Sequence, residues 1–288
     1  MRIVAENLTF TYNKKSKFAV DALKNVSLTI EEGSFFGIIG HTGSGKSTFI
    51  QHLNGIIPVS SGKLTVGDIN LAEKKKIVRK RYKELRSKVG MVFQYPEYQL
   101  FAETVFLDVA FGYKNFYPEA TEEDVKNAVF KALAMLGLPA DCINKSPLDL
   151  SGGQKRRVAI AGVLVSNPEI IVLDEPVAGL DPVGKKELMK ILHDLHRSGV
   201  VKTVVIVSHD MDEVCENCTD VAVFSEGQIV FSGKPKSVFK RFNEMNDLRL
   251  GVPVTGYLLE DLKGVGVEID SDFTRDNFVQ KIVEYYKK

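Results

Sequence analysis

A glycine-rich stretch near the start of the chain has the residue types that hold a triphosphate. It follows an apolar run that predicts a buried strand over 35–39 and precedes a predicted helix over 46–53. Its residues are Gly40, His41, Thr42, Gly43, Ser44, Gly45, Lys46, Ser47 and Thr48. Glycines let successive backbone N–H groups turn toward an anion, and the following helix adds its positive end. We expect Lys46 to reach the β- and γ-phosphates and the Ser47 hydroxyl to ligate Mg²⁺.

Two adjacent carboxylates follow a second apolar run. Residues 170–173 predict a buried strand, and Asp174 and Glu175 come directly after it. Beside a phosphate site, Asp174 is expected to hold Mg²⁺, directly or through water. Glu175 is expected to orient and polarise the water that attacks the terminal phosphate. Acidic turn residues also end many strands, so this pair indicates a catalytic site only because the glycine-rich stretch is also present.

Two more polar side chains follow predicted strands. Gln94 comes after residues 89–93, and His209 comes after residues 204–207. Because the carboxyl ends of parallel strands meet at one edge of a sheet, where open α/β proteins bind ligands, both side chains are expected near the phosphates. For His209 we favour a contact with the γ-phosphate over a role as a helix cap or surface residue.

The elements that must position these residues alternate between strand and helix. This alternation predicts an α/β fold with a mostly parallel core sheet. Residues 3–10 and 26–30 alternate in polarity, which is typical of half-exposed antiparallel strands and predicts an N-terminal antiparallel β subdomain. Apolar residues at helical spacing over 105–138 predict an inserted α-helical subdomain at about 95–165. A change in composition at 232–235 suggests a boundary. We therefore expect a domain over 1–239 and a small C-terminal extension over 240–288, which is helical and which we expect to support dimerisation.

The composition limits the classes of partner that the protein is expected to bind. The 288 residues include 38 basic and 37 acidic side chains, so the net charge of +1 provides no general attraction for nucleic acid. Basic residues within 74–83 lie between acidic ones and predict a solvated helix face. Every apolar run is much shorter than the roughly 20 residues needed to span a bilayer. Three cysteines are too few for a disulfide framework and fit a reducing cytoplasm.

A second anion nest begins another predicted helix. It consists of Ser151, Gly152, Gly153 and Gln154, and an ordinary Ser–Gly helix cap would have the same residues. The motifs together, in order, resemble those of the ATP-binding cassette (ABC) ATPases over about residues 3–239. The segments that carry the resemblance are 40–48, Gln94, 150–154, Asp174 with Glu175, 178–181, and His209.

The resemblance implies that two cassettes pair head to tail with ATP between them. Ser151, Gly152, Gly153 and Gln154 would then contact the ATP held by the P-loop, residues 40–47, of the other cassette. Tyr12 matches the aromatic residue that stacks on adenine, and an exposed tyrosine at a strand end is the alternative. Asp181 matches the loop that links the two active sites. Gln94 matches the residue that senses Mg²⁺ and the transport partner.

Within this family, residues 93–101 and 153–161 are most similar to the ATPase subunits of energy-coupling factor transporters, which import vitamins or transition-metal ions. The resemblance implies ATP hydrolysis that drives integral membrane coupling and substrate-binding subunits. It also implies a second ATPase subunit, identical or related, and a peripheral position at the cytoplasmic face of the cell membrane. Val177 and residues 162–164 depart from the usual pattern at positions without a catalytic role.

Acidic residues near Gln94 suggest where such a partner docks. Glu97, Glu103 and Asp108 are expected to face basic side chains of a membrane subunit, and a solvated acidic face is the alternative.

Two other functions stay open. One is a soluble ABC ATPase without a role in transport, and the other is a clamp that binds ATP without hydrolysing it. Glu175 and His209 favour hydrolysis over the clamp.

Overall fold

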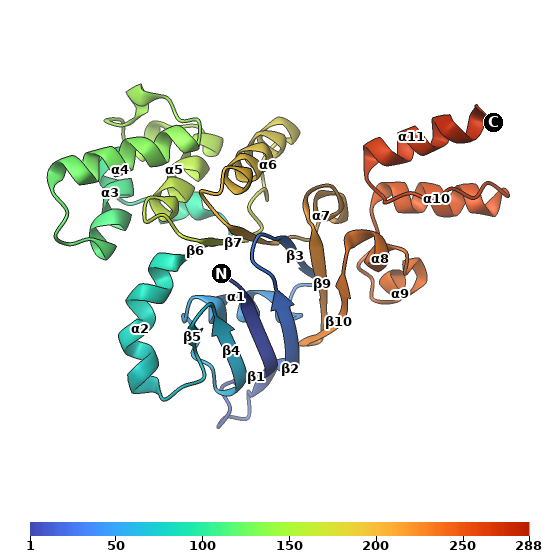
Figure 1. The fold of residues 1–288 in the computed structure, drawn as a ribbon, viewed down its shortest axis with the longest axis horizontal. Coiled ribbons are helices and arrows are strands. Elements are labelled where there is room, and N and C mark those ends of the chain that lie inside the picture. Colours follow the sequence, from blue (N-terminus) through green and yellow to red (C-terminus); the bar gives the residue numbers. More distant parts are fainter. Residues whose placement is uncertain (288) are drawn as a thin grey trace.

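The computed structural model describes residues 1–287 and contains two β-sheets with helices around them (Figure 1). The larger sheet has the strand order β10-β9-β3-β8-β7-β6. Its strands are β3 (Phe35–Gly40), β6 (Val89–Val92), β7 (Ile170–Asp174), β8 (Thr203–Val207), β9 (Asp220–Ser225) and β10 (Gln228–Gly233). All neighbours pair in parallel except β9 and β10, which are antiparallel. The carboxyl ends of β3, β6, β7 and β8 therefore meet at one edge.

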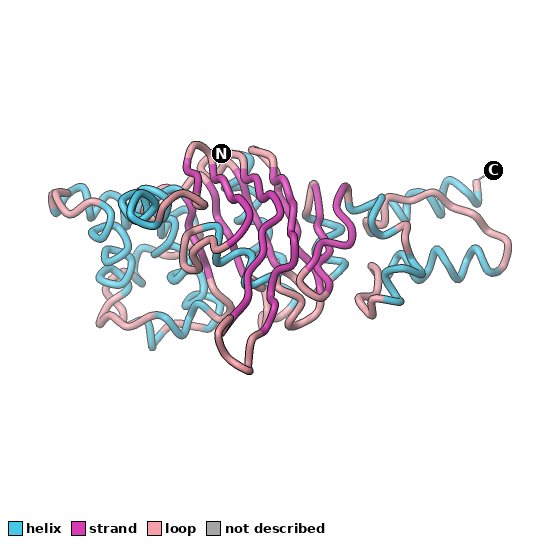
Figure 2. The backbone as a smooth tube through the Cα atoms, turned by 90° about the horizontal axis from the view of Figure 1, so that it is seen from below, coloured by secondary structure: helices cyan, strands magenta, loops and turns pink. Residues whose placement is uncertain are grey.

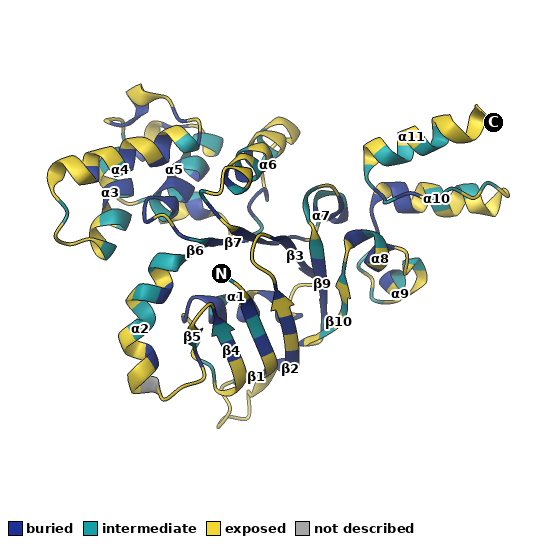
Figure 3. Ribbon diagram, in the orientation of Figure 1, coloured by how far each residue is buried: buried dark blue, intermediate teal, exposed yellow. Residues whose placement is uncertain are grey.

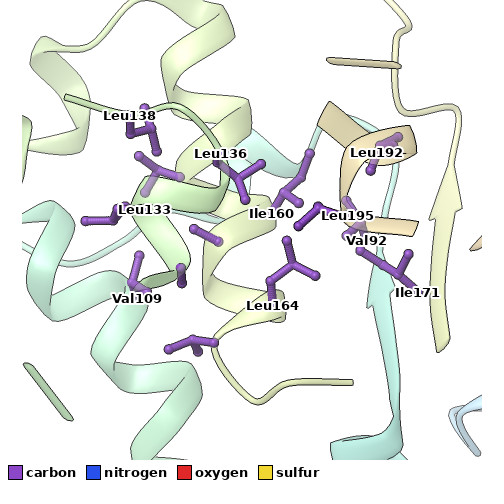
Figure 4. Close-up of a cluster of buried hydrophobic side chains, with 14 of the residues drawn as sticks. Val92, Val109, Leu133, Leu136, Leu138, Ile160, Leu164, Ile171, Leu192 and Leu195 are labelled. Atoms are coloured by element: carbon purple, nitrogen blue, oxygen red, sulfur yellow. The ribbon is translucent and has the colours of Figure 1, made fainter. Parts of the chain in front are cut away.

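The parallel strands are buried on both faces, as their unbroken apolar sequences require. Alternate residues enter two different cores: Ile171 and Leu173 join one cluster, and Ile170 and Val172 join the other. Figure 4 shows the first cluster, in which Val92 and Ile171 face side chains from two helices, α5 (Gly152–Leu164) and α6 (Pro182–Arg197). This packing fixes the strands and with them the edge at which they end.

The second core joins the two sheets through α1 (Lys46–Leu53), whose Phe49, Ile50 and Leu53 are fully buried. The smaller sheet is antiparallel, with the order β2-β1-β4-β5. Its strands are β1 (Ile3–Tyr12), β2 (Val20–Ile30), β4 (Ser61–Val66) and β5 (Ile69–Asn70), and α2 (Lys75–Lys88) follows them. Figure 2 shows the strands of both sheets in the middle of the molecule, between helices at either end. Helix α1 thus packs against residues of both sheets.

Only helices and 3₁₀ turns occur between β6 and β7. They are η1 (Pro96–Gln99), α3 (Val105–Phe116), α4 (Glu122–Met135), η2 (Ala140–Cys142), η3 (Pro147–Asp149) and α5. These elements form one end of the molecule (Figures 1 and 2). Capping boxes begin α4 at Thr121 and α5 at Ser151.

The opposite end consists of C-terminal helices. They are α8 (Pro235–Phe239), α9 (Phe242–Asp247), α10 (Val254–Gly264) and α11 (Arg275–Tyr286), and α7 (Met211–Asn217) packs between β3 and α8. Phe239, Met245 and Phe273 share one core with Ile39 of β3 and Met211 of α7. The start of the extension is thus continuous with the strand that leads into the P-loop, whereas α10 and α11 are largely exposed (Figure 3). Lys288, the last residue of the expected extension, lies outside the described residues.

The expected fold class is confirmed: a mostly parallel sheet, an antiparallel sheet and added helices are all present. The sequence reading missed four strands, β4, β5, β9 and β10. Strands β9 and β10 form a hairpin whose Gln228–Gly233 strand alternates in burial at the sheet edge, a weaker signal than the buried strands give. Within residues 1–287, every helix is too short or too polar to span a bilayer.

Candidate functional site

A cavity of about 800 Å³ opens at the carboxyl edge of the parallel strands. The predicted residues that line it are Tyr12, Gly40, His41, Thr42, Gly43, Gly45, Lys46, Ser47, Thr48, Gln94, Asp174, Glu175 and His209. They come from β1, the P-loop, and the ends of β6, β7 and β8. Parallel pairing therefore brings into one cavity side chains that are far apart in the sequence.

The P-loop backbone requires glycine at its two ends. A β-carbon on Gly40 would lie 2.3 Å from the carbonyl oxygen of Phe224, and one on Gly45 would lie 2.4 Å from that of Ala22. Gly45 also has a φ of 102° and precedes α1 without a side-chain cap. The first N–H groups of α1 are thus left to bind an anion. Ser44 lies beneath the loop, 4% exposed, and does not line the cavity.

Lys46 is buried at the start of α1, with an exposed fraction of 7%. Its Nζ donates hydrogen bonds to the carbonyl oxygens of Gly40 at 2.6 Å and His41 at 2.7 Å. Burial lowers the pKa of Lys46, while the charges of Glu175 and Asp174 act in the opposite direction. An ammonium group that is short of solvent and bonded to neutral carbonyls gains most from an anionic phosphate.

Asp174 and Ser47 lie beside each other under the cavity. The Ser47 hydroxyl donates a hydrogen bond to the Asp174 carboxylate. Burial raises the pKa of Asp174, and this hydrogen bond partly offsets the effect. A half-buried carboxylate, a hydroxyl and the amide oxygen of Gln94 are hard oxygen donors of the kind that Mg²⁺ prefers. The residues present therefore fit a magnesium ion.

Glu175 is held between the two other predicted polar residues. Gln94 Nε2 donates to Glu175 Oε2 at 2.8 Å, and His209 Nδ1 lies 3.2 Å from Glu175 Oε1. The backbone N–H of Glu175 bonds to the carbonyl of Val207 at 2.9 Å, and its φ of 50° turns the chain sharply after β7. The carboxylate is thus fixed at the cavity wall with lone pairs left to accept a proton from water.

Tyr12 lines the cavity from the end of β1. Its hydroxyl lies 3.2 Å from Thr48 Oγ1, and its ring packs edge-on against Phe10 with centroids 4.8 Å apart. The ring is 38% exposed. An anchored, partly exposed ring can receive a flat base, which is compatible with the predicted adenine contact.

The second anion nest lies elsewhere. Ser151, Gly152, Gly153 and Asp181 line a separate hollow of about 470 Å³, and none of them lines the P-loop cavity. Ser151 and Gln154 form a reciprocal cap at the start of α5, and Asp181 Oδ1 accepts from the N–H groups of Val183 and Gly184 at the start of α6. Within one chain these residues therefore cap helices, and none of them contributes to the P-loop cavity of that chain.

Of the three acids predicted to face basic side chains of a membrane subunit, Glu97 is placed wrongly by that prediction and Asp108 already has partners within the chain. Glu97 is only 17% exposed and forms two hydrogen bonds with the buried guanidinium of Arg156, at 3.0 and 2.7 Å. Asp108 accepts from the N–H groups of Phe101 and Ala102 at 2.9 and 2.8 Å. Both carboxylates already serve the fold, because each compensates a donor that would otherwise lack a partner. Glu103 is exposed.

Sequence reasoning did not identify several residues that line the P-loop cavity: Val20, Asp21, Ala22, Tyr95, Met211, Arg249 and Leu250. The strand start at Val20 has no motif around it, and nothing in its pattern marks a ligand site. Arg249 and Leu250 belong to the C-terminal extension, far from any motif. Only the three-dimensional packing of the extension brings them to the cavity.

Comparisons with known proteins agree with this geometry. The sequence profile of the ABC transporter family matches residues 23–178. An energy-coupling factor transporter ATP-binding protein, EcfA2, of Caldanaerobacter subterraneus is 42% identical over 288 residues, covering 100% of this chain and 98% of the relative. EcfA2 of Lacticaseibacillus paracasei is 46% identical over 270 residues, with 94% and 92% of the two chains covered.

Solved structures are also similar. CbiO1 of Clostridium perfringens, described as part of the ABC transporter complex cbiONQ, superposes with a TM-score of 0.74 at 37% identity over 90% of this chain and 98% of that one. The ATP-binding cassette MJ0796, in a dimer bound to ADP and Pi, gives a TM-score of 0.70 at 30% identity over 81% and 98%. The chain belongs to the ABC transporter family, among the ATP-binding proteins of energy-coupling factor transporters.

Proposed function

We propose that this protein is the ATP-binding and ATP-hydrolysing subunit of an energy-coupling factor transporter. One observation carries the enzymatic part of the proposal: Glu175 is held by Gln94 and His209 at the wall of the P-loop cavity. The role in transport is supported by relatives of nearly the same length that are named energy-coupling factor transporter ATP-binding proteins.

ATP binds with its phosphates in the P-loop and its adenine against Tyr12. Lys46 exchanges its bonds to the Gly40 and His41 carbonyls for bonds to the β- and γ-phosphates. The free N–H groups at the start of α1 complete the anion site. The remaining loop residues, His41 to Thr48, shape the cradle around the phosphate chain.

Mg²⁺ would be held by Ser47, the amide oxygen of Gln94 and, directly or through water, Asp174. A bound Mg²⁺ would neutralise charge on the phosphate oxygens. The chain's own contribution is to orient these donors: the Ser47 hydroxyl can donate to the Asp174 carboxylate and keep its lone pairs for the metal, and the Gln94 amide nitrogen stays on Glu175. Gln94 can therefore bind metal and the catalytic carboxylate at once.

Hydrolysis depends on Glu175 as general base. The carboxylate accepts a hydrogen bond from the attacking water and takes its proton as the water oxygen bonds to the γ-phosphorus and the bond to ADP breaks. His209 contacts the γ-phosphate and steadies Glu175. Lys46 stabilises the charge that develops on the transferred group.

The site is completed by a second cassette, identical or related. Ser151, Gly152, Gly153 and Gln154 of that cassette lie across the ATP, and Asp181 links the two sites. The nest lies outside the P-loop cavity of its own chain, and the N–H groups of Gly152 and Gly153 begin a helix with a positive end. Closure of the pair excludes water and places these donors on the γ-phosphate, and hydrolysis releases them.

Hydrolysis drives membrane-embedded coupling and substrate-binding subunits that import a vitamin or a transition-metal ion, with this protein at the cytoplasmic face of the membrane. The surface after Gln94 suits such a partner through apolar groups rather than the acids first expected. Tyr98 is 84% exposed, and Phe101 is 68% exposed and packs edge-on against Phe111. Exposed aromatic groups of this kind are typical of protein interfaces.

The substitution Glu175→Gln tests the proposal. It should lower phosphate release by at least about 100-fold, since removal of a general base costs that much, while Mg-ATP binding measured by calorimetry stays intact. Equal rates for the two proteins would leave only a clamp that binds ATP. The substitution Glu103→Gln, at an exposed position away from the cavity, serves as the matched control.

Recovery of membrane subunits with the tagged protein from detergent-solubilised membranes would separate a transporter subunit from a soluble ATPase.

A further inference from the structure

The C-terminal extension reaches the nucleotide cavity. Arg249 and Leu250, in the turn between α9 and α10, line the same cavity as the P-loop. The preceding residue, Leu248, has its carbonyl oxygen within hydrogen-bonding distance of His41 Nε2. Because His41 is the second residue of the P-loop, the turn is tied directly to the phosphate cradle.

The backbone of this turn is well fixed. The N–H of Leu250 bonds to the carbonyl of Met245 at 3.0 Å, and the N–H of Arg249 bonds to that of Asn246 at 2.7 Å. These two bonds form the Schellman arrangement that ends many helices. Met245 is fully buried in the core that contains Ile39, which directly precedes the P-loop. The Arg249 side chain therefore starts from a rigid position beside the cradle.

Arginine is an unusual residue at this position. Arg249 has a φ of 56°, in the left-handed region, and the same position of a Schellman arrangement is usually glycine because a β-carbon is disfavoured there. Strained residues of this kind cluster at ligand sites. Glycine would satisfy the backbone, so the backbone does not explain the arginine.

The guanidinium group of Arg249 has no carboxylate partner among residues 1–287, although Asp174 and Glu175 line the same cavity. By contrast, Arg241, in the same extension, pairs with Glu244 at 3.2 Å. A guanidinium presents a planar fork of donors that matches two oxygens of a phosphate. An exposed and unpaired fork at the mouth of a phosphate cavity is suited to such a ligand.

We propose that Arg249 binds the terminal phosphate of the nucleotide held by the P-loop of the same chain. Its surroundings favour the γ-phosphate: Leu250 packs against the core that contains Met211, two residues after His209, and His41 holds the turn at the start of the P-loop. This inference rests on the proposed function. It makes the C-terminal extension part of the ATP site, and loss of the γ-phosphate removes the contact between Arg249 and the nucleotide.

Calorimetry with Arg249→Gly tests the proposal. Glycine removes the guanidinium and fits a φ of 56°, so this variant should fold with a melting temperature equal to or above that of the wild type. Its affinity for the magnesium complex of AMP-PNP, an ATP analogue that is not hydrolysed, should fall roughly 10-fold, as for loss of a charged hydrogen bond. Its affinity for Mg-ADP should change less than about twofold. Arg249→Lys, which keeps the charge but not the fork, should lose less.

Arg241→Ala is the matched control, because it removes an arginine from the same extension outside the cavity. It should bind both nucleotides as the wild type does. The proposal is overturned if Arg249→Gly binds Mg-AMP-PNP with wild-type affinity, if it loses affinity for both nucleotides equally, or if Arg241→Ala shows the same loss. A wild-type protein that binds neither nucleotide would refute the proposed function instead.

Discussion

At the scale of single residues, burial controls the charged groups around the cavity. Burial lowers the pKa of Lys46 and raises the pKa of Asp174, so both groups favour a ligand that stabilises their charged forms. Glu213, in α7 after His209, is a third group whose pKa is shifted by burial. Its Oε2 accepts from Ser208 Oγ at 2.7 Å, while its buried Oε1 has no hydrogen-bond partner among the described residues. Ionised Glu213 is therefore a local source of instability.

The Glu213→Gln variant should be more stable than the wild type at pH 8, with a melting temperature higher by roughly 2 °C. Burial raises the pKa of Glu213, and the nearby Asp210 adds to this, whereas Ser208, Lys185 and His209 act in the opposite direction. Because the folded-state pKa exceeds the unfolded one, the wild type loses stability as the pH rises from the unfolded value through the folded value. Thermal unfolding at pH 4 should therefore show little difference between the two proteins. A larger gain at pH 4 than at pH 8 would contradict this sign.

At the scale of elements, Arg156 joins three segments of the site. It is 2% exposed on α5, and besides Glu97 it donates to the carbonyls of Pro176 at 3.1 Å and Ala178 at 2.7 Å. The start of α5, the segment after Gln94 and the loop after Glu175 are thus held by one side chain.

Removal of Glu97 leaves the Arg156 charge buried without its carboxylate. Glu97→Ala should therefore lower the free energy of unfolding by about 3 kcal/mol or more, the cost of breaking a buried ion pair. Asp141→Ala is the matched control, because Asp141 pairs with Lys145 at 2.7 Å on an exposed surface, and its loss should lower the free energy of unfolding far less than the loss of Glu97. Urea unfolding measures both values, and similar losses in the two variants would argue against a structural role for Glu97.

At the scale of the whole molecule, the sequence was sufficient for the strands and motifs that carry strong local signals. The apolar runs before Gly40 and Asp174 are buried strands, and parallel pairing puts Gln94, Glu175 and His209 in one cavity, as expected from their positions after strands. Local signals could not reveal interactions over long sequence distances. Glu97 reads as a surface acid until Arg156 is placed beside it, and Arg249 has no motif at all.

The central claim also concerns the whole molecule: ATP is held between the P-loop of one cassette and the nest at Ser151 of another. Sedimentation velocity of Glu175→Gln with Mg-ATP tests it most directly, because this variant should retain the nucleotide. The account predicts that Mg-ATP converts the 32.0 kDa chain into a species of about twice that mass, and that adding Ser151→Arg abolishes the conversion without loss of P-loop binding. A Glu175→Gln protein that binds Mg-ATP tightly and stays a single cassette, both alone and with a related ATPase subunit recovered with it from membranes, or one whose dimer tolerates Ser151→Arg, would contradict it.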